Sequence, residues 1–115
     1  MTKTRFGMSY KVGDIVLVKF PFTNLKKYKR RPVLIVKDEN PYGDVVCFQI
    51  TSNQYQNSLV QINESDFNRV KLTITSFVKY DKCFTINNSV IDKKITDVNE
   101  AFLNRLKSSF CKEIF

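Results

Sequence analysis

The sequence predicts a mainly β protein with a C-terminal α-helix, organised as a small antiparallel β-barrel. Up to residue 86, short runs rich in Val, Ile, Phe and Thr alternate with turn-prone clusters, which is the pattern of strands joined by short loops. Near the C-terminus the apolar spacing changes to one residue in four, as in an amphipathic helix. A length of 115 residues and a hydrophobic content of 43% suit one domain over residues 1–115.

Six segments carry the β pattern, and residues that favour tight turns separate them. The cluster at 40–44 supplies Asn, Pro, Gly and Asp for a turn, and the polar residues 54–58 are expected to form a loop. Residues 15–18 and 33–36 are apolar at every position, which implies burial on both faces and favours a strongly bent barrel. The predicted strands are residues 15–20, 33–37, 45–51, 59–62, 72–81 and 83–86.

The last segment is predicted to be an amphipathic helix. Asp97 followed three residues later by Glu100 resembles a capping box, so the helix is expected to begin near Val98. Its apolar stripe is expected to pack against the core or against a second copy of the chain. The stripe comprises Val98, Phe102, Leu106, Phe110 and Ile114.

The charge balance points to a polyanionic partner. Nineteen Lys and Arg against eleven Asp and Glu give a formal net charge of +8. In so small a protein this charge creates a field that attracts polyanions and speeds their encounter. Nucleic acid is therefore the leading class of partner.

The residue content excludes several kinds of chemistry. The chain has no histidine, so the His-dependent arrangements common in acid–base and acyl-transfer catalysis are absent. Cys47, Cys83 and Cys111 are widely spaced, which suggests neither a disulfide framework nor a zinc site and fits a reducing cytoplasm. The only adjacent acids are Asp38 and Glu39, so no metal and no cofactor is expected. No membrane-spanning or secretory segment is expected.

A basic run precedes the second predicted strand and is expected to form a phosphate-binding loop. Its cations are Lys26, Lys27, Lys29, Arg30 and Arg31. Pro32 follows directly and disfavours the α region for the residue before it, so Arg31 should be held extended where the loop enters the sheet. Tyr28 lies within the run and is a candidate for stacking on a nucleic-acid base.

A polar cluster at the end of the third predicted strand is expected to face the basic run. It consists of Thr51, Ser52, Asn53 and Gln54. If the second and third strands are antiparallel neighbours, Arg31 and Thr51 lie on one rim. A guanidinium matches two phosphate oxygens, and a hydroxyl can bind a third. Each residue alone is also typical of a solvated loop or strand end, but the combination with the net charge favours a phosphodiester site.

Four segments together resemble the MazF/PemK-type toxins of bacterial toxin–antitoxin modules. Residues 12–23 carry a Gly-Asp start before an apolar strand, residues 29–36 an Arg-Pro step, and residues 50–52 a Thr-Ser step. Residues 76–86 are similar to the strand pair that follows the variable middle region of that family. The resemblance covers nearly the whole chain, although residues 24–29 lack the glycine of many members and residues 96–98 replace a Gly-Lys-Leu-like step.

The resemblance implies an SH3-like, CcdB/MazF-like barrel that forms a homodimer and acts in the cytoplasm. It also implies metal-independent cleavage of single-stranded RNA to 2',3'-cyclic phosphate and 5'-hydroxyl ends, with a cognate antitoxin as inhibitor. By the same resemblance Arg31 and Thr51 are the expected catalytic pair. The expected RNA-binding residues are Lys26, Lys27, Tyr28, Lys29, Arg30, Ser52, Asn53 and Gln54.

Two other functions remain open at this point. Toxins of the CcdB type share the barrel and inhibit DNA gyrase without cleaving a substrate, but such an inhibitor needs no Arg-Pro and Thr-Ser rim. A plain RNA-binding barrel would bind RNA with a steep salt dependence and release no product.

Overall fold

The computed structural model describes residues 9–21 and 28–115, which form six strands and three helices. The mainly β fold with a C-terminal helix is thereby confirmed. The strands are β1 (Asp14–Pro21), β2 (Tyr28–Lys37), β3 (Asp44–Thr51), β4 (Leu59–Ile62), β5 (Ser76–Asn87) and β6 (Ile91–Asp97). The helices are the 3-10 turns η1 (Glu64–Asp66) and η2 (Asn88–Val90) and the α-helix α1 (Glu100–Ile114). None of the described helices is long and apolar enough to span a bilayer.

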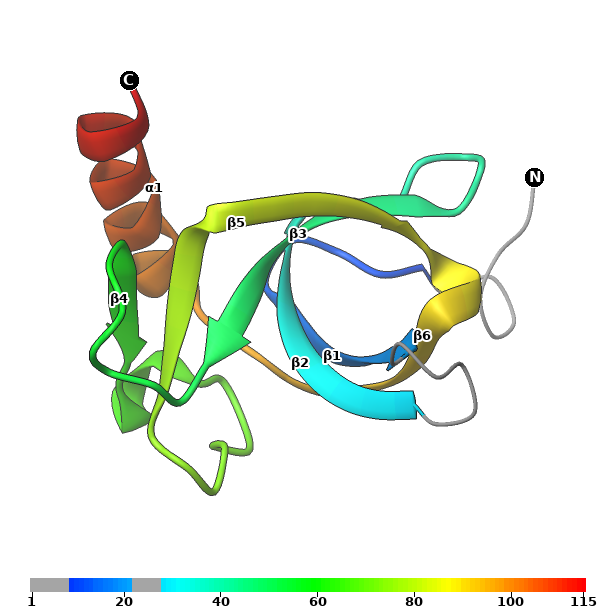
Figure 1. Ribbon diagram of the computed structural model, residues 1–115, viewed down its shortest axis with the longest axis horizontal. Coiled ribbons are helices and arrows are strands. Elements are labelled where there is room, and N and C mark those ends of the chain that lie inside the picture. Colours follow the sequence, from blue (N-terminus) through cyan, green and yellow to red (C-terminus); the bar gives the residue numbers. More distant parts are fainter. Residues whose placement is uncertain (1–8, 22–27) are drawn as a thin grey trace.

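All six strands belong to one antiparallel sheet with the order β4-β5-β3-β2-β1-β6 (Figure 1). The sheet is strongly bent, and shifts of register in three of its pairings allow the bend, because an extra residue in one strand kinks and twists the ladder. Strands β4 and β6 stay at the two edges and do not pair with each other. Within the described residues the sheet is therefore open and only resembles a barrel.

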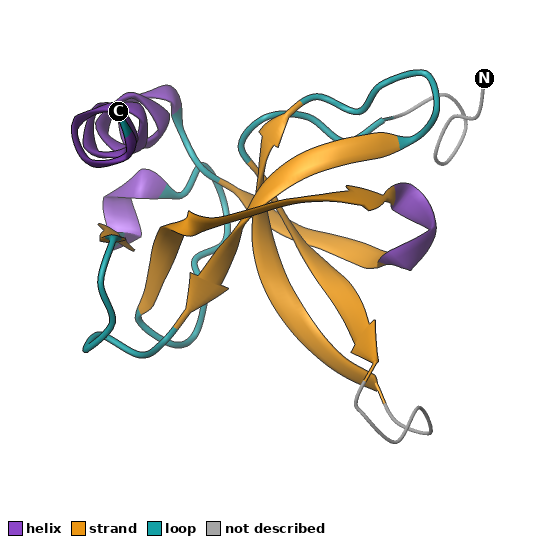
Figure 2. Ribbon diagram, turned by 45° about the horizontal axis from the view of Figure 1, so that its top comes forward, coloured by secondary structure: helices purple, strands orange, loops and turns teal. Residues whose placement is uncertain are grey.

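The two faces of the sheet bury two separate clusters of apolar side chains. On one face Ile15, Leu34 and Phe48 pack against Phe102 and Leu106 of α1. On the opposite face Val16, Val33 and Cys47 are among the residues of the second cluster. Figure 2 shows α1 and η1 together at one end of the bent sheet. This double burial is why β1 and β2 are apolar at consecutive positions.

Strands β2 and β3 separate at Pro32, and this separation makes room for the site described below. Their pairing begins with Val33 opposite Gln49, one residue after Pro32, which has no backbone N–H to donate to a neighbouring strand. At the same place β3 has a register shift against β5, between Phe48 and Gln49. Figure 1 shows the end of β3 and the beginning of β2 diverging from this point.

The bounds of three predicted strands are wrong, and β6 was not predicted. β2 begins at Tyr28, so residues 28–31 of the basic run lie in a strand and Pro32 is inside it. β5 is one continuous strand from Ser76, whereas two strands over 72–81 and 83–86 were predicted. The apolar pattern of β6 is interrupted in the middle by Asp92, Lys93 and Lys94. Charged residues of this kind are common in edge strands.

The helix begins two residues later than predicted. Asn99 is the N-cap, and its side-chain oxygen accepts the backbone N–H of Phe102 at 2.9 Å. Asp97 instead lies at the end of β6, where Lys94 Nζ at 2.8 Å and Asn68 Nδ2 at 2.7 Å bind its carboxylate. The hydrogen bond and charge of Lys94 outweigh the effect of burial and hold the pKa of Asp97 below its usual value.

Candidate nucleic-acid interface

An open pocket of about 380 Å³ lies where β2 and β3 separate. One part of its wall is polar and basic, and the other part is apolar. The polar side chains come from Lys29, Arg30, Arg31, Gln49, Thr51, Ser52, Thr73 and Ser76. The apolar wall consists mainly of Leu17, Pro32, Ile50, Leu72, Ile74 and Ile95. Cations and hydroxyls beside apolar surface suit a ligand that has both phosphates and bases.

Arg31 of β2 and Thr51 of β3 both line this pocket. β2 and β3 pair as far as Val33 and Gln49. Beyond this pair the strands diverge, and Arg31 and Thr51 each lie two residues past it on their own strand. The antiparallel neighbourhood of β2 and β3 expected from the sequence is thus observed, and both residues line the same pocket.

The hydroxyl of Thr51 is oriented by the loop that follows it. Its Oγ1 accepts the backbone N–H of Asn53 at 3.1 Å, and Gln56 Nε2 lies at 3.5 Å from the same oxygen. A hydroxyl has two acceptor lone pairs and one proton to donate. Because the two nitrogens approach the lone pairs, and Thr51 donates to no acceptor in the described part of the chain, its proton is available to a ligand.

The two neighbouring arginines differ in their partners. Arg30 Nε donates to Asp92 Oδ2 at 2.7 Å, and the two form an ion pair. The hydrogen bond from Arg30 is the largest of the effects that lower the pKa of the Asp92 carboxyl. Arg31 is exposed and pairs with no carboxylate among residues 9–21 and 28–115. An unpaired guanidinium is the stronger candidate for binding phosphate.

A second, open pocket of about 470 Å³ extends from Arg31 over the other side of β2. Phe20 and Phe84 line it and contact each other edge to face, with ring centroids 6.0 Å apart. Gln49 and Lys82 complete its polar border. Exposed aromatic edges beside cations are typical of surfaces that hold unpaired nucleotides.

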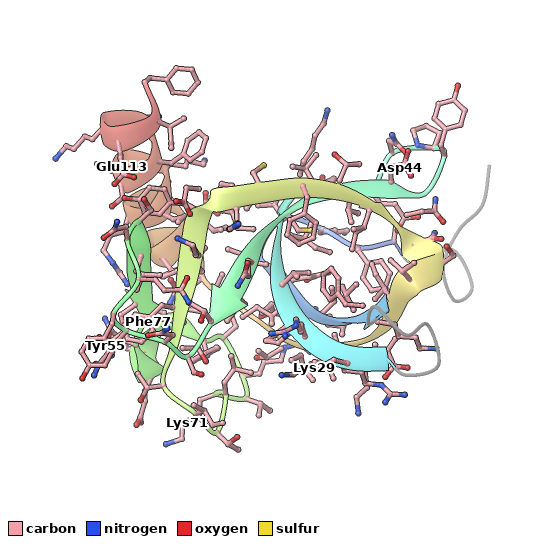
Figure 3. All side chains as sticks on the ribbon, in the orientation of Figure 1. Lys29, Asp44, Tyr55, Lys71, Phe77 and Glu113 are labelled. Atoms are coloured by element: carbon pink, nitrogen blue, oxygen red, sulfur yellow. The ribbon has the colours of Figure 1, made fainter. Side chains whose placement is uncertain are left out.

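The loop between η1 and β5 is the main part of the pocket that sequence reasoning missed. Leu72, Thr73 and Ile74 line the pocket, and about 65% of Ile74 is exposed. Figure 3 shows Lys71 projecting near the tip of this loop. The Ile, Thr, Phe and Val content of residues 72–81 led to the strand prediction over that range, so the sequence contained no separate signal for a pocket wall.

Not every predicted site residue reaches the pocket. Asn53 and Gln54 do not line it, and Asn53 instead shapes the turn, since its Oδ1 accepts the backbone N–H of Tyr55 at 3.0 Å. Lys26 and Lys27 lie outside the described residues. Tyr28 opens β2, but its side chain is likewise outside them. Lys29, Arg30 and Ser52 line the pocket as expected of ligand-binding residues.

Comparison with known proteins gives a consistent match. Residues 11–114 match the family of PemK-like, MazF-like toxins of type II toxin–antitoxin systems. No curated protein matches the sequence. Likeness to solved structures at 16–18% identity shows the fold alone.

Three solved structures resemble the chain over nearly its whole length. A MazE–MazF structure from Deinococcus radiodurans has a TM-score of 0.73 at 16% identity and covers 91% of this chain and 95% of its own. An endoribonuclease from a mycobacterial species has a TM-score of 0.71 at 18% identity, covering 96% and 95%. A mycobacterial endoribonuclease in complex with its cognate antitoxin has a TM-score of 0.68 at 18% identity, covering 91% and 92%.

Proposed function

The chain belongs to the PemK-like, MazF-like toxins of type II toxin–antitoxin systems, and from this premise we propose that it is an endoribonuclease that cleaves single-stranded RNA. The observation that carries the proposal is that Arg31 and Thr51 line one basic pocket at the point where β2 and β3 separate. Arg31 has no carboxylate partner among the described residues, and the Thr51 proton is free to donate. Together they provide cationic and neutral donors for one phosphate group.

The proposed reaction is an internal transesterification. The ribose 2'-oxygen attacks the adjacent phosphorus and loses its proton, the bond from phosphorus to the 5'-oxygen breaks, and the 5'-oxygen takes up a proton. The products are a 2',3'-cyclic phosphate and a 5'-hydroxyl end. Negative charge grows on the non-bridging oxygens during this step, and preorganised donors stabilise it most effectively where water is partly excluded.

The two central residues have different roles in this reaction. Arg31 stabilises the phosphorane charge, because a guanidinium stays protonated up to a pKa above about 12 and is a poor base. Thr51 donates to a phosphate oxygen and cannot serve as a base while its lone pairs accept from Asn53 and Gln56. Metal independence is part of the proposal. It is supported by the lack, within the described residues, of any group of three His, Cys, Asp or Glu side chains that could hold a metal.

The RNA strand is proposed to follow the basic surface around Arg31. Lys29 and Ser52 line the first pocket, and Lys82 lies at the border of the second. The net charge of +8 supplies attraction to any phosphate backbone, while base contacts in the two pockets supply the preference for a short sequence. Binding should therefore weaken as salt rises.

The partners proposed for the chain are an inhibiting antitoxin and a second copy of itself. The support is the family assignment together with a similar mycobacterial endoribonuclease that was solved in complex with its cognate antitoxin. An antitoxin that covers the basic pocket would carry acidic residues, because burying the unpaired charge of Arg31 requires an opposite charge. A cytoplasmic location fits a toxin that acts on RNA.

The test uses purified protein and a mixed pool of single-stranded RNA in the presence of a chelator. Sequencing of the new 5'-hydroxyl ends should give one short motif, and Arg31→Ala should lower cleavage by at least about 100-fold while the protein stays folded. Lys107→Ala on α1 removes the same charge far from the pocket and is the matched control. Full activity of the Arg31→Ala protein, or intact RNA together with trapped gyrase–DNA complexes, would contradict the proposal.

A further inference from the structure

The loop of residues 52–58 begins at Thr51 and passes over β5 to reach β4. It has to cross β5 because the sheet order places β5 between β3 and β4. Figure 1 shows this crossing at the lower left, between the arrowhead of β3 and β4. The loop contains both groups that contact the Thr51 hydroxyl, the amide of Asn53 and the side chain of Gln56. Whatever fixes this loop therefore also fixes the direction of the Thr51 hydroxyl.

Lys79 of β5 binds the loop through its side chain. Its backbone pairs with Gln49 on one side and with Leu59 on the other, so its side chain points to the same face as that of Gln49. Only 8% of Lys79 is exposed. Its Nζ donates to the carbonyl oxygen of Asn57 at 2.9 Å and forms an ion pair with Asp81 Oδ1, also at 2.9 Å.

A buried ammonium group is costly, and this one has no role in either hydrophobic cluster. Transferring an ion out of water is unfavourable by several kcal/mol unless partners compensate it. The partners of Lys79 are a carboxylate of its own strand and one carbonyl of the loop. An apolar side chain would fill the same space at lower cost, so the bond to the loop is the feature that an ammonium uniquely provides.

A second contact fixes the far end of the loop. Glu113 of α1 accepts hydrogen bonds from the hydroxyls of Ser58 and Tyr80, and the backbone N–H of Tyr80 donates to the Ser58 carbonyl at 3.1 Å. Figure 3 shows Glu113 at the C-terminal end of α1. Ser58 has a φ of 62°, an uncommon conformation for a residue with a side chain. The loop is therefore fixed at Ser58, and Lys79 adds a second bond one residue closer to Gln56, at the Asn57 carbonyl.

We propose that Lys79 is a positioning residue that acts through the 52–58 loop to direct the Thr51 hydroxyl toward the scissile phosphate. Lys79 holds the Asn57 carbonyl, which is next to Gln56 in the chain, and Gln56 and Asn53 in turn occupy the Thr51 oxygen. The role in cleavage rests on the proposed ribonuclease function, whereas the effect on the loop does not.

The kinetic test is a double-mutant cycle with Lys79→Met and Thr51→Ala, followed under single-turnover conditions on an RNA that contains a mapped cleavage site. Lys79→Met should lower the rate of the cleavage step about tenfold, as a small misplacement of a catalytic group does, and should leave RNA affinity within about twofold. In the Thr51→Ala background the same substitution should change the rate less than about twofold, because its target is already missing. Lys107→Met on the exposed face of α1 is the charge-matched control.

Two kinetic outcomes would overturn the proposal. An equal loss in both backgrounds would mean that Lys79 acts independently of Thr51. Weaker RNA binding with an unchanged cleavage rate would mean that Lys79 contacts the substrate instead.

A second measurement tests the loop without any RNA. In amide spectra of the nitrogen-15-labelled protein, Lys79→Met should shift and deprotect the N–H groups of Asn53 and Tyr55 and leave those of Val33 and Leu34 unchanged. Unchanged Asn53 and Tyr55 resonances in a folded Lys79→Met protein would overturn the proposal even if the protein cleaves RNA. Conversely, if the unmodified protein cleaves no RNA, the proposed function fails while this spectrum still decides whether Lys79 orients the loop.

Discussion

Thr51 and Asn53 form a closed turn in which the threonine hydroxyl accepts the backbone N–H two residues later, at 3.1 Å. Such turns are common where a strand ends. Here the turn has a chemical consequence, because it occupies an acceptor position of the hydroxyl oxygen and leaves the proton to be donated to a ligand in the pocket. Thr51 can therefore stabilise a developing negative charge, while Arg31 across the strand pair provides the positive one.

Thr51→Val should lower the cleavage rate by about 100-fold or more, since valine keeps the shape but has no proton to donate. Thr51→Ser keeps the hydroxyl and should lose less than about tenfold. The measurement is the single-turnover rate for each variant, with circular dichroism to show that both are folded. Equal rates for the valine and serine variants would show that the hydroxyl has no role.

Arg30 and Arg31 should respond differently to substitution although they are adjacent. Arg30 is held by Asp92, so Arg30→Ala should weaken RNA binding a few-fold and leave the cleavage step unchanged. Asp92→Asn removes the competing carboxylate and should strengthen binding. If Arg30 contacts a phosphate, its removal should reduce the slope of log affinity against log salt by about 0.7. Filter binding across a salt series measures both effects, and a cleavage rate lowered as much as by Arg31→Ala would contradict the distinction.

The existence of the central strands and the presence of Arg31 and Thr51 in one pocket could be predicted because local signals agreed there. Residues 15–18 and 33–36 are apolar at every position, turn residues fill 40–44, and consecutive strands are usually antiparallel neighbours. These features fix β1, β2 and β3 without knowledge of the rest of the fold. Antiparallel pairing puts the start of β2 beside the end of β3, which is why Arg31 and Thr51 line the same pocket.

The remaining features depend on contacts between distant parts of the chain. Asp92, which holds Arg30, is 62 residues away in sequence and lies on an edge strand with no hydrophobic signal. Asp97 and Asn99 both have side chains that can cap a helix, and only the binding of Asp97 by Lys94 leaves the cap to Asn99. The apolar loop residue Ile74 has a strand-like pattern but lines a pocket. Each outcome was decided by a tertiary partner.

The ion pair between Asp66 and Arg105 should make stability depend on pH in the acid range. Arg105 Nη2 binds the nearly buried Asp66 carboxylate at 2.8 Å and joins η1 to α1. Burial alone would raise the pKa of Asp66, but the hydrogen bonds from Arg105 and from the Asn63 amide lower it overall. Because the pKa is lower in the folded state, the pair contributes its full stabilisation at pH values above the pKa of Asp in the unfolded chain, about 3.9. This contribution is lost as the pH falls through the pKa of the folded state.

Arg105→Met should therefore reduce the free energy of unfolding by about 1 kcal/mol at pH 7, a modest value because the guanidinium is partly exposed, and by less below pH 3. Urea unfolding at the two pH values measures the difference. Lys71→Met disrupts the exposed pair with Glu64 and should change stability by less than about 0.5 kcal/mol at either pH. An Arg105→Met effect that is the same at pH 7 and below pH 3 would exclude the charge interaction as its cause.

The three cysteines should react with a thiol reagent at three different rates. Cys47 is fully buried in the second hydrophobic cluster, and burial, with a smaller contribution from Cys83, raises its pKa to about 12. Burial also raises the pKa of the exposed Cys83 thiol, while Cys111 is exposed on α1. Because the thiolate is the reactive form, Cys111 should react first, Cys83 second, and Cys47 only when the chain unfolds.

At pH 8 the native protein should thus release two equivalents of dye from a disulfide reagent and a third only in denaturant. Cys47→Ser should abolish the third equivalent and leave the first two unchanged. The raised pKa has a further consequence, because above pH 9 the unfolded chain releases a proton that the folded chain retains. Stability should therefore fall as pH rises from 9 toward 12. Rapid reaction of all three thiols in the native protein would show that the second cluster does not enclose Cys47.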